Sequence, residues 1–175
     1  MAASDTDRFK IIVNLPMARP SFSLMQRCYN DYLDGHQKPC SSADNQCAVR
    51  MSTALVRCGF SLADFPDQDR IHKGKFCDLK VNHILGAGEL RDYLRLKLLP
   101  TAEFPHHKPK HAQDVFDEVE DKTGILYFNN VDGSTDHIDL FDGSKIMNEV
   151  FYGGEGVTLS RYFKRANSIT FFALT

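Results

Sequence analysis

The 175-residue chain is predicted to fold as a single α+β domain in which N-terminal helices pack on an antiparallel β-sheet. Two observations predict this class. Apolar residues recur at helical spacing in the first two thirds of the sequence, and short strand-like segments separated by tight-turn signals fill the last third. No repeat, low-complexity tract or linker divides the chain, so residues 1–175 are treated as one domain.

Four helices are expected, at residues 21–33, 47–58, 89–99 and 111–120. Gly59 ends the second helix because glycine favours the left-handed cap, and Pro100 ends the third because proline cannot continue a helix. Asp44 or Asn45 can cap the second helix with a side-chain oxygen, which places Cys47 in the first turn. The connecting segments 60–86 and 103–110 are expected to be irregular.

Three strands are expected in the last third, at residues 123–129, 137–141 and 168–174. Asp-Gly pairs follow the first two strands and predict tight turns. In the middle strand, Ile138 and Leu140 point to one face, and His137 and Asp139 point to the other. The sequence therefore places an imidazole and a carboxylate on one face of the sheet.

Charge and hydropathy exclude two classes of partner. The net charge of −2 gives no general attraction to nucleic acid. No stretch approaches the roughly 20 apolar residues of a membrane helix, and the apolar run at residues 11–13 is too short for a signal peptide. We therefore expect no nucleic-acid binding, no membrane insertion, and synthesis in the cytoplasm without a cleaved leader.

Cys47 and His137 form the strongest candidate catalytic pair. A thiol in the first turn of a helix lies in the positive end of the helix dipole, which favours the nucleophilic thiolate, and the unpaired N–H groups there can stabilise an oxyanion. His137 at a strand start could act as its base if the helix packs on that face. Taken alone, both residues also fit structural roles, as a buried thiol and a hydrogen-bonded strand histidine.

The remaining cysteines and histidines leave other interpretations open. The five cysteines, Cys28, Cys40, Cys47, Cys58 and Cys77, match no zinc-binding spacing and are compatible with reduced thiols or with up to two disulfides. A cluster at His106, His107, His111 and Asp114 could bind zinc if it were helical. Pro105 and Pro109 favour a polar loop instead, so no metal and no cofactor is expected.

Two segments stand out for their residue order: residues 45–52 read Asn-Gln-Cys-Ala-Val-Arg-Met-Ser, and residues 136–143 read Asp-His-Ile-Asp-Leu-Phe-Asp-Gly. Both resemble segments of the type VI secretion amidase effectors, specifically the fourth group of that superfamily. The family has a Cys-Ala-x-Arg-x-Ser helix start and a Gly-His-x-Asp-Leu-Trp-x-Gly strand in the same order. Asp136 replaces the family's glycine, Phe141 its tryptophan, and Asn148 the acidic residue that follows the histidine by eleven positions.

The resemblance implies a papain-like amidase fold related to NlpC-type cell-wall peptidases. It also implies hydrolysis of the D-glutamyl–meso-diaminopimelate bond in peptidoglycan stem peptides, with Cys47 as nucleophile and His137 as base. Asn148 is expected to orient His137, as asparagine does in papain-like peptidases, and Asp139 on the same strand face is the alternative. The basic stretch through Lys73, Lys75 and Lys80 could line the path of the acidic peptide.

The resemblance further implies delivery by the type VI secretion apparatus into the periplasm of target bacteria, and a cognate immunity protein that plugs the cleft. In that oxidising compartment a pair among Cys28, Cys40, Cys58 and Cys77 could form a disulfide. Two alternatives remain. A deamidase or acyltransferase can use the same cysteine and histidine on the same fold, and a non-catalytic cell-wall interaction module would need neither.

Overall fold

The computed structural model describes residues 19–33, 40, 45–73, 81–98, 100–105, 111–147 and 160–175. The elements are α1 (Phe22–Leu33), α2 (Cys47–Arg57), the 3-10 turn η1 (Gln68–Arg70), β1 (Ile71–His72), β2 (His83–Ile84), α3 (Ala87–Lys97), β3 (Ala102–Phe104), α4 (Ala112–Val119), β4 (Gly124–Val131), β5 (Thr135–Phe141), α5 (Arg161–Arg165) and β6 (Ser168–Ala173). The predicted α+β class, with helices preceding an antiparallel sheet, is confirmed.

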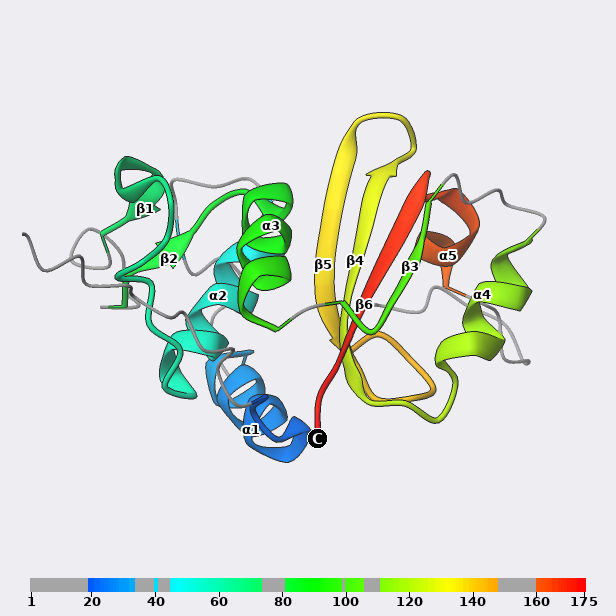
Figure 1. The fold of residues 1–175 in the computed structure, drawn as a ribbon, viewed down its shortest axis with the longest axis horizontal. Helices are drawn as coiled ribbons and strands as arrows, with labels where there is room; N and C mark the ends of the chain where they lie inside the picture. Colours follow the sequence, from blue (N-terminus) through cyan, green and yellow to red (C-terminus); the bar gives the residue numbers. More distant parts are fainter. Residues whose placement is uncertain are drawn as a thin grey trace, which may run out of the picture.

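The main sheet has four antiparallel strands in the order β3-β6-β4-β5. Figure 1 shows it standing between two groups of helices, with α1, α2 and α3 on one side and α4 and α5 on the other. Because helices cover both faces, β4 is buried over most of its length and reads as an apolar run rather than an alternation.

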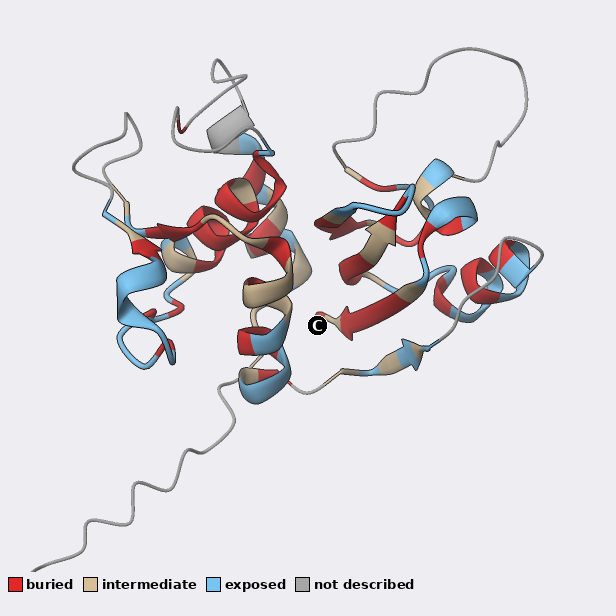
Figure 2. Cartoon of the chain, turned by 90° about the horizontal axis from the view of Figure 1, so that it is seen from above, coloured by how far each residue is buried: buried red, intermediate tan, exposed pale blue. Residues whose placement is uncertain are grey.

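Two apolar cores lie on the two faces of the sheet. The first joins the N-terminal helices to side chains such as Ile138 and Leu140 of β5. The second joins α4 and α5 to Phe128 and Phe171 on the opposite face. Figure 2 shows this burial along the strands and on the inward sides of the helices. The predicted packing of the N-terminal helices on the sheet is therefore correct, and the second covered face is an addition to it.

The turn between β4 and β5 sets where β5 begins. Asp132 and Gly133 both have positive φ values, 55° and 86°, as expected for the predicted Asp-Gly turn. The Asp136 side chain accepts a hydrogen bond from the Asn130 N–H at 2.9 Å and closes the turn further. This arrangement fixes His137 two residues after the strand starts at Thr135.

The segment expected to be irregular between residues 60 and 86 contains a second, two-stranded sheet. β1 and β2 pair with Ile71 opposite Ile84 and His72 opposite His83. The Ile84 N–H donates to the Ser52 hydroxyl at 2.9 Å, which ties this small sheet to α2. The expectation was wrong here because strands of two residues are too short to show periodicity. The short strand β3 likewise lies at the edge of a segment expected to be a loop.

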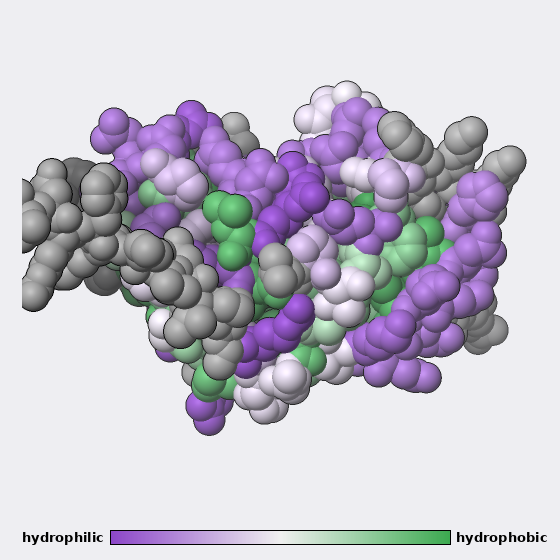
Figure 3. Space-filling model, in the orientation of Figure 1, coloured by the Kyte–Doolittle hydropathy of each residue, from purple (hydrophilic) through white to green (hydrophobic). Residues whose placement is uncertain are grey.

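The surface features agree with the composition. In the part of the chain that the structure describes, no helix is both long and apolar enough to cross a bilayer. Figure 3 shows hydrophilic side chains over α3 and along α4 on this face of the molecule. The exposed acids of α4, Asp114, Asp117 and Glu118, form a solvated surface.

Candidate active site

Cys47 is the first residue of α2, as the sequence predicted. The Cys47 N–H donates to Oδ1 of Asn45 at 3.2 Å, so Asn45 supplies the capping oxygen although Gln46 is the residue that directly precedes the helix. The Cys47 thiol points toward the start of β5, where the Asp136 carbonyl oxygen lies 4.0 Å from its sulfur. The helix start therefore presents the sulfur to the strand that carries His137.

His137 lies on β5 with 8% of its surface exposed. Its ring stacks on Tyr162 with a centroid distance of 4.0 Å and an interplanar angle of 1°. Its Nε2 lies 3.4 Å from Oδ2 of Asp139, and Cys47 is near enough to the ring to affect its pKa.

Burial works to lower the pKa of His137, but the interactions with Asp139 and with Cys47 outweigh it and raise the pKa to about 10. With this pKa the imidazole is protonated at neutral pH. A protonated imidazole beside a thiol favours the thiolate, which is the nucleophilic form.

Asp139 is fully buried beneath His137. Its Oδ1 accepts hydrogen bonds from the Tyr29 hydroxyl at 2.5 Å and from the Leu140 N–H at 2.8 Å. Burial and the Asp139 charge raise the pKa of Tyr29 well above its usual value, so the hydroxyl remains a donor. These two bonds fix the carboxylate with Oδ2 toward His137. Side chains from α1, α2 and β5 thus meet at one place.

A cavity of about 610 Å³ opens above the pair. It is lined by Asn45, Gln46, Cys47, Arg50, Val131, Asp132, Thr135, His137, Arg161 and Tyr162. Cys47 and His137 therefore share a wall of one cavity, although each is largely buried. Two arginines, Arg50 and Arg161, give this cavity groups that can bind anions.

Sequence reasoning missed several residues of this site. Arg161 and Tyr162 belong to α5, a five-residue helix that was not predicted because it is too short to show a period. Tyr29 was seen only as part of the apolar face of α1. Arg50 lies one helical turn after Cys47, within the Cys-Ala-x-Arg-x-Ser segment, so it carried a signal that was not used.

Other candidates from the sequence lie elsewhere. Lys73 lines a different cavity, away from Cys47, and His111 pairs with Asp114 at 3.1 Å on the exposed surface. Asn148, Lys75, Lys80, Cys77, His106 and His107 lie outside the described residues. Of the two residues considered for orienting His137, the structure thus describes only Asp139.

A helical lobe, a covered antiparallel sheet and a cysteine-histidine junction between them define a papain-like α+β fold. The sequence model of the family described as "Type VI secretion system (T6SS), amidase effector protein 4" (Tae4) matches residues 43–172. The chain belongs to this family of amidase effectors.

Solved structures of this family share the fold. The type VI effector Tae4 from Enterobacter cloacae is 16% identical with a TM-score of 0.64, covering 92% of this chain and 100% of that one. Tae4 in the Tae4–Tai4 effector–immunity complex from the same organism is 16% identical with a TM-score of 0.62, covering 90% of this chain and 99% of that one. Tae4 from Salmonella typhimurium, in complex with the immunity protein Tai4 from Enterobacter cloacae, is 17% identical with a TM-score of 0.59. That match covers 90% of this chain and 100% of the Salmonella chain. No curated protein matches the chain.

Proposed function

We propose that this amidase effector hydrolyses peptidoglycan stem peptides by cysteine catalysis, with Cys47 as nucleophile and His137 as base. The observation that carries the proposal is that Cys47 and His137 line one open cavity while the buried Asp139 carboxylate lies 3.4 Å from the His137 ring. The amidase description of the family agrees with this chemistry. Nucleophile, base and orienting group are the three parts that such a mechanism needs.

The reaction proceeds through a thioester. The Cys47 thiolate attacks the amide carbonyl, and the carbon–nitrogen bond breaks as the His137 imidazolium gives its proton to the leaving amine. The neutral imidazole then takes a proton from water, whose oxygen attacks the thioester and releases Cys47 as thiolate. A His137 pKa of about 10 keeps the proton available for the first half of this cycle.

Asp139 is the residue we propose to orient the imidazole. Its Oδ2 lies 3.4 Å from Nε2, and Tyr29 holds its other oxygen. Orienting a histidine requires only an acceptor for the ring N–H, so Asn148 remains the competing proposal from the sequence. The two are separated by substitution, as described in the Discussion.

The oxyanion donors are the backbone N–H of Cys47 and a neighbouring group. In this structure the Cys47 N–H is bonded to Oδ1 of Asn45, whose Nδ2 in turn donates to the Asp136 carbonyl at 3.2 Å. A substrate oxygen that displaces Oδ1 from the N–H would gain the Cys47 donor, with the Asn45 amide beside it. Asn45 would then act as the second donor.

The proposed bond is the one between D-glutamate and meso-diaminopimelate. Stem peptides carry several carboxylates, and the guanidinium groups of Arg50 and Arg161 line the cavity beside Cys47. Planar guanidinium groups bind carboxylates in two-pronged fashion, which would align the scissile amide over the sulfur. We assign the acidic ends of the peptide to these two side chains rather than to the Lys73 stretch.

The family and the Tae4–Tai4 complexes suggest the biological setting. We propose delivery by the type VI secretion apparatus into the periplasm of target bacteria, and an immunity protein that covers the Cys47 cavity. An acidic or amide group of such a partner could occupy the position between Arg50 and Arg161.

The test is digestion of purified peptidoglycan by the wild type, by Cys47→Ala and by Cys58→Ala, with products identified by mass spectrometry. We expect the wild type and Cys58→Ala to release fragments ending at D-glutamate, and Cys47→Ala to release none. Equal fragments from Cys47→Ala would remove the mechanism. Ammonia release or transfer products without cleavage would instead identify a deamidase or acyltransferase, and binding without products a wall-interaction module.

A further inference from the structure

A second cysteine-histidine cluster lies outside the Cys47 cavity. Cys40 precedes α2, His72 is on β1 and His83 is on β2. The ligand-type atoms of these three side chains all lie within 4.8 Å of one another. Residues separated by 32 and 11 positions are thus gathered into one place by the small sheet and the approach to α2.

The two histidines are held side by side by strand pairing. His72 and His83 are direct partners in the β1–β2 register, and their ring centroids lie 5.0 Å apart. Nδ1 of His83 lies 2.8 Å from the Val81 carbonyl oxygen. Since a carbonyl can only accept, Nδ1 carries the proton and Nε2 presents a lone pair. Metal-bound histidines in proteins are oriented by this same hydrogen bond to a backbone carbonyl.

Cys40 is fully buried, and its backbone is clamped on both sides by one side chain. The Cys40 N–H donates to Oε1 of Gln46 at 3.1 Å, and Nε2 of Gln46 donates to the Cys40 carbonyl at 2.8 Å. These bonds fix the position of the sulfur near the two rings.

We propose that Cys40, His72 and His83 form a binding site for a divalent zinc ion. A thiolate and two imidazoles are the ligand types that zinc prefers, and a tetrahedral site separates them by about 3.3–3.6 Å. The observed limit of 4.8 Å requires only small side-chain rotations to reach that spacing. Three protein ligands leave the fourth position to water. This inference departs from the expectation of no metal and does not rest on the proposed function.

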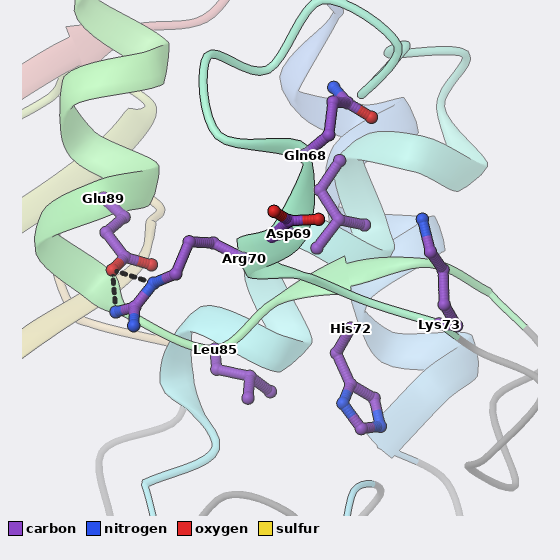
Figure 4. Close-up of a pocket in the computed structure, with 8 residues that line it drawn as sticks. Gln68, Asp69, Arg70, His72, Lys73, Leu85 and Glu89 are labelled. Carbon is purple, nitrogen blue, oxygen red and sulfur yellow. Dashed lines mark hydrogen bonds and ion pairs between the residues drawn. The ribbon is translucent and has the colours of Figure 1, made fainter.

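One of the three proposed ligands lines a cavity. His72 lines a cavity of about 590 Å³, together with Gln68, Asp69, Arg70, Ile71, Lys73, Leu85 and Glu89. Figure 4 shows His72 and Lys73 leaving β1 in opposite directions, with His72 pointing away from the ion pair of Arg70 and Glu89. A bound metal would join this small sheet to the segment before α2. Because Gln46 both clamps Cys40 and precedes Cys47, the site would also steady the nucleophile's helix.

The competing explanation is a buried polar cluster in which the thiol and the two imidazoles interact only with one another and bind no metal. Cobalt binding separates the two. Metal-free full-length protein is titrated with Co²⁺ and Zn²⁺ under reducing conditions, and the same titrations are made with Cys40→Ser, His83→Ala and His111→Ala. His111→Ala is the matched control because His111 belongs to the other histidine cluster, on the exposed surface.

We expect one equivalent of Co²⁺ with visible bands of a tetrahedral site and a thiolate charge-transfer band, both displaced by Zn²⁺. Cys40→Ser should lose the charge-transfer band, His83→Ala should lose at least about 100-fold in affinity, and His111→Ala should match the wild type. Binding unaltered in Cys40→Ser and His83→Ala, or lost in His111→Ala, would overturn the proposal. So would the absence of any stoichiometric binding to the wild type.

A measurement on the wild type covers the case in which the variants do not fold. At free zinc 100 times the Kd, the unfolding temperature of the wild type should rise by roughly 5–10 °C. An unfolding temperature that zinc leaves unchanged would contradict the site.

Discussion

Two cysteine-histidine clusters lie near the start of α2, and the groups around their imidazoles differ. Around Cys47 there is one imidazole, a carboxylate behind it and an open cavity in front. Around Cys40 there are two imidazoles, a backbone carbonyl behind one of them and a fully buried sulfur. The carboxylate of Asp139 favours a protonated ring, whereas the carbonyl of Val81 holds the proton of His83 on Nδ1, so that Nε2 is its ligand-type nitrogen.

The difference teaches that the group behind the imidazole decides what the cysteine beside it can do. A protonated ring stabilises a thiolate and supplies a proton to a leaving group, but it cannot bind a metal. A neutral ring can bind a metal through its unprotonated nitrogen, but it carries no charge that would stabilise a thiolate. The predictions below test that contrast, beginning with the largest expected effect.

Replacing His137 should remove nearly all amidase activity. The His137→Ala variant loses both the ion-pair partner of the thiolate and the proton donor, so kcat/KM should fall about 10⁴-fold. Peptidoglycan digestion measures the loss, and circular dichroism reports whether the fold is kept. His111→Ala, an exposed histidine outside the cavity, is the control and should stay within about twofold of wild type. A wild-type rate in His137→Ala would show that the cavity does not use this base.

The Asp139 carboxylate should matter through the pKa of His137. Asp139→Asn removes a cause of the raised pKa, so the pKa should fall below about 10 and the rate should drop about 10³-fold. Activity that requires the imidazolium is present below the His137 pKa and is lost as pH rises through it. The alkaline limb of the pH–rate profile should therefore move to lower pH in Asp139→Asn.

Two variants complete that test. Asp142→Asn changes a carboxylate that serves the following turn, through bonds to Ser144 and Lys145, and should leave the profile unchanged. Asn148→Ala should have a small effect if Asp139 orients the ring. A shifted profile in Asn148→Ala together with a normal one in Asp139→Asn would assign the orienting role to Asn148 instead.

A third cysteine environment pairs two sulfurs with each other. The sulfurs of Cys28, on α1, and Cys58, just after α2, lie 2.8 Å apart. Burial and the neighbouring Cys28 raise the pKa of Cys58 to about 12, so the Cys58 thiol stays protonated at neutral pH. Among the described cysteines, this is the pair placed to form a disulfide in an oxidising compartment.

Oxidation of that pair should stabilise the chain without activating it. Loss of two protons and two electrons to a disulfide oxidant would close a loop of about 30 residues and add about 3 kcal/mol to the free energy of unfolding. Urea unfolding of oxidised and reduced protein measures the difference. In Cys28→Ser the two conditions should give the same midpoint. A destabilised oxidised form would show that α1 and α2 must separate to make the bond.

Elements that are long enough to show a repeating apolar pattern, or that end at strong stop signals, could be predicted from the sequence. Helix α2 follows from its apolar face, its capping oxygen and Gly59, and the β4–β5 hairpin follows from Asp132 and Gly133. The short elements β1, β2 and α5 could not be predicted, since two to five residues show no period and are held by tertiary contacts. Their formation depends on packing against α2 and β4.

The candidate site divides in the same way. Cys47, His137 and Asp139 lie on predicted elements and were named from the sequence as candidates, whereas Arg161 and Tyr162 lie on α5 and were not named. The Cys40 cluster also escaped prediction, because strand pairing at His72 and His83 creates it rather than sequence spacing. Site residues that lie on long helices and strands can be predicted from a sequence. Sites that form only when short elements pack together cannot.

The smallest expected effect concerns the support beneath Asp139. Tyr29→Phe removes the hydroxyl that donates to Oδ1 at 2.5 Å but keeps the buried ring, and the Leu140 N–H still occupies the same oxygen. The loss of one buried hydrogen bond to a charged group should cost about 1–3 kcal/mol of stability. Activity should fall only several-fold because Oδ2 still faces His137. Urea unfolding and peptidoglycan digestion measure the two effects, with Tyr93→Phe, which removes a hydroxyl far from the cavity, as the control. An activity loss as large as that of Asp139→Asn would mean that Tyr29, not the strand, holds the carboxylate in place.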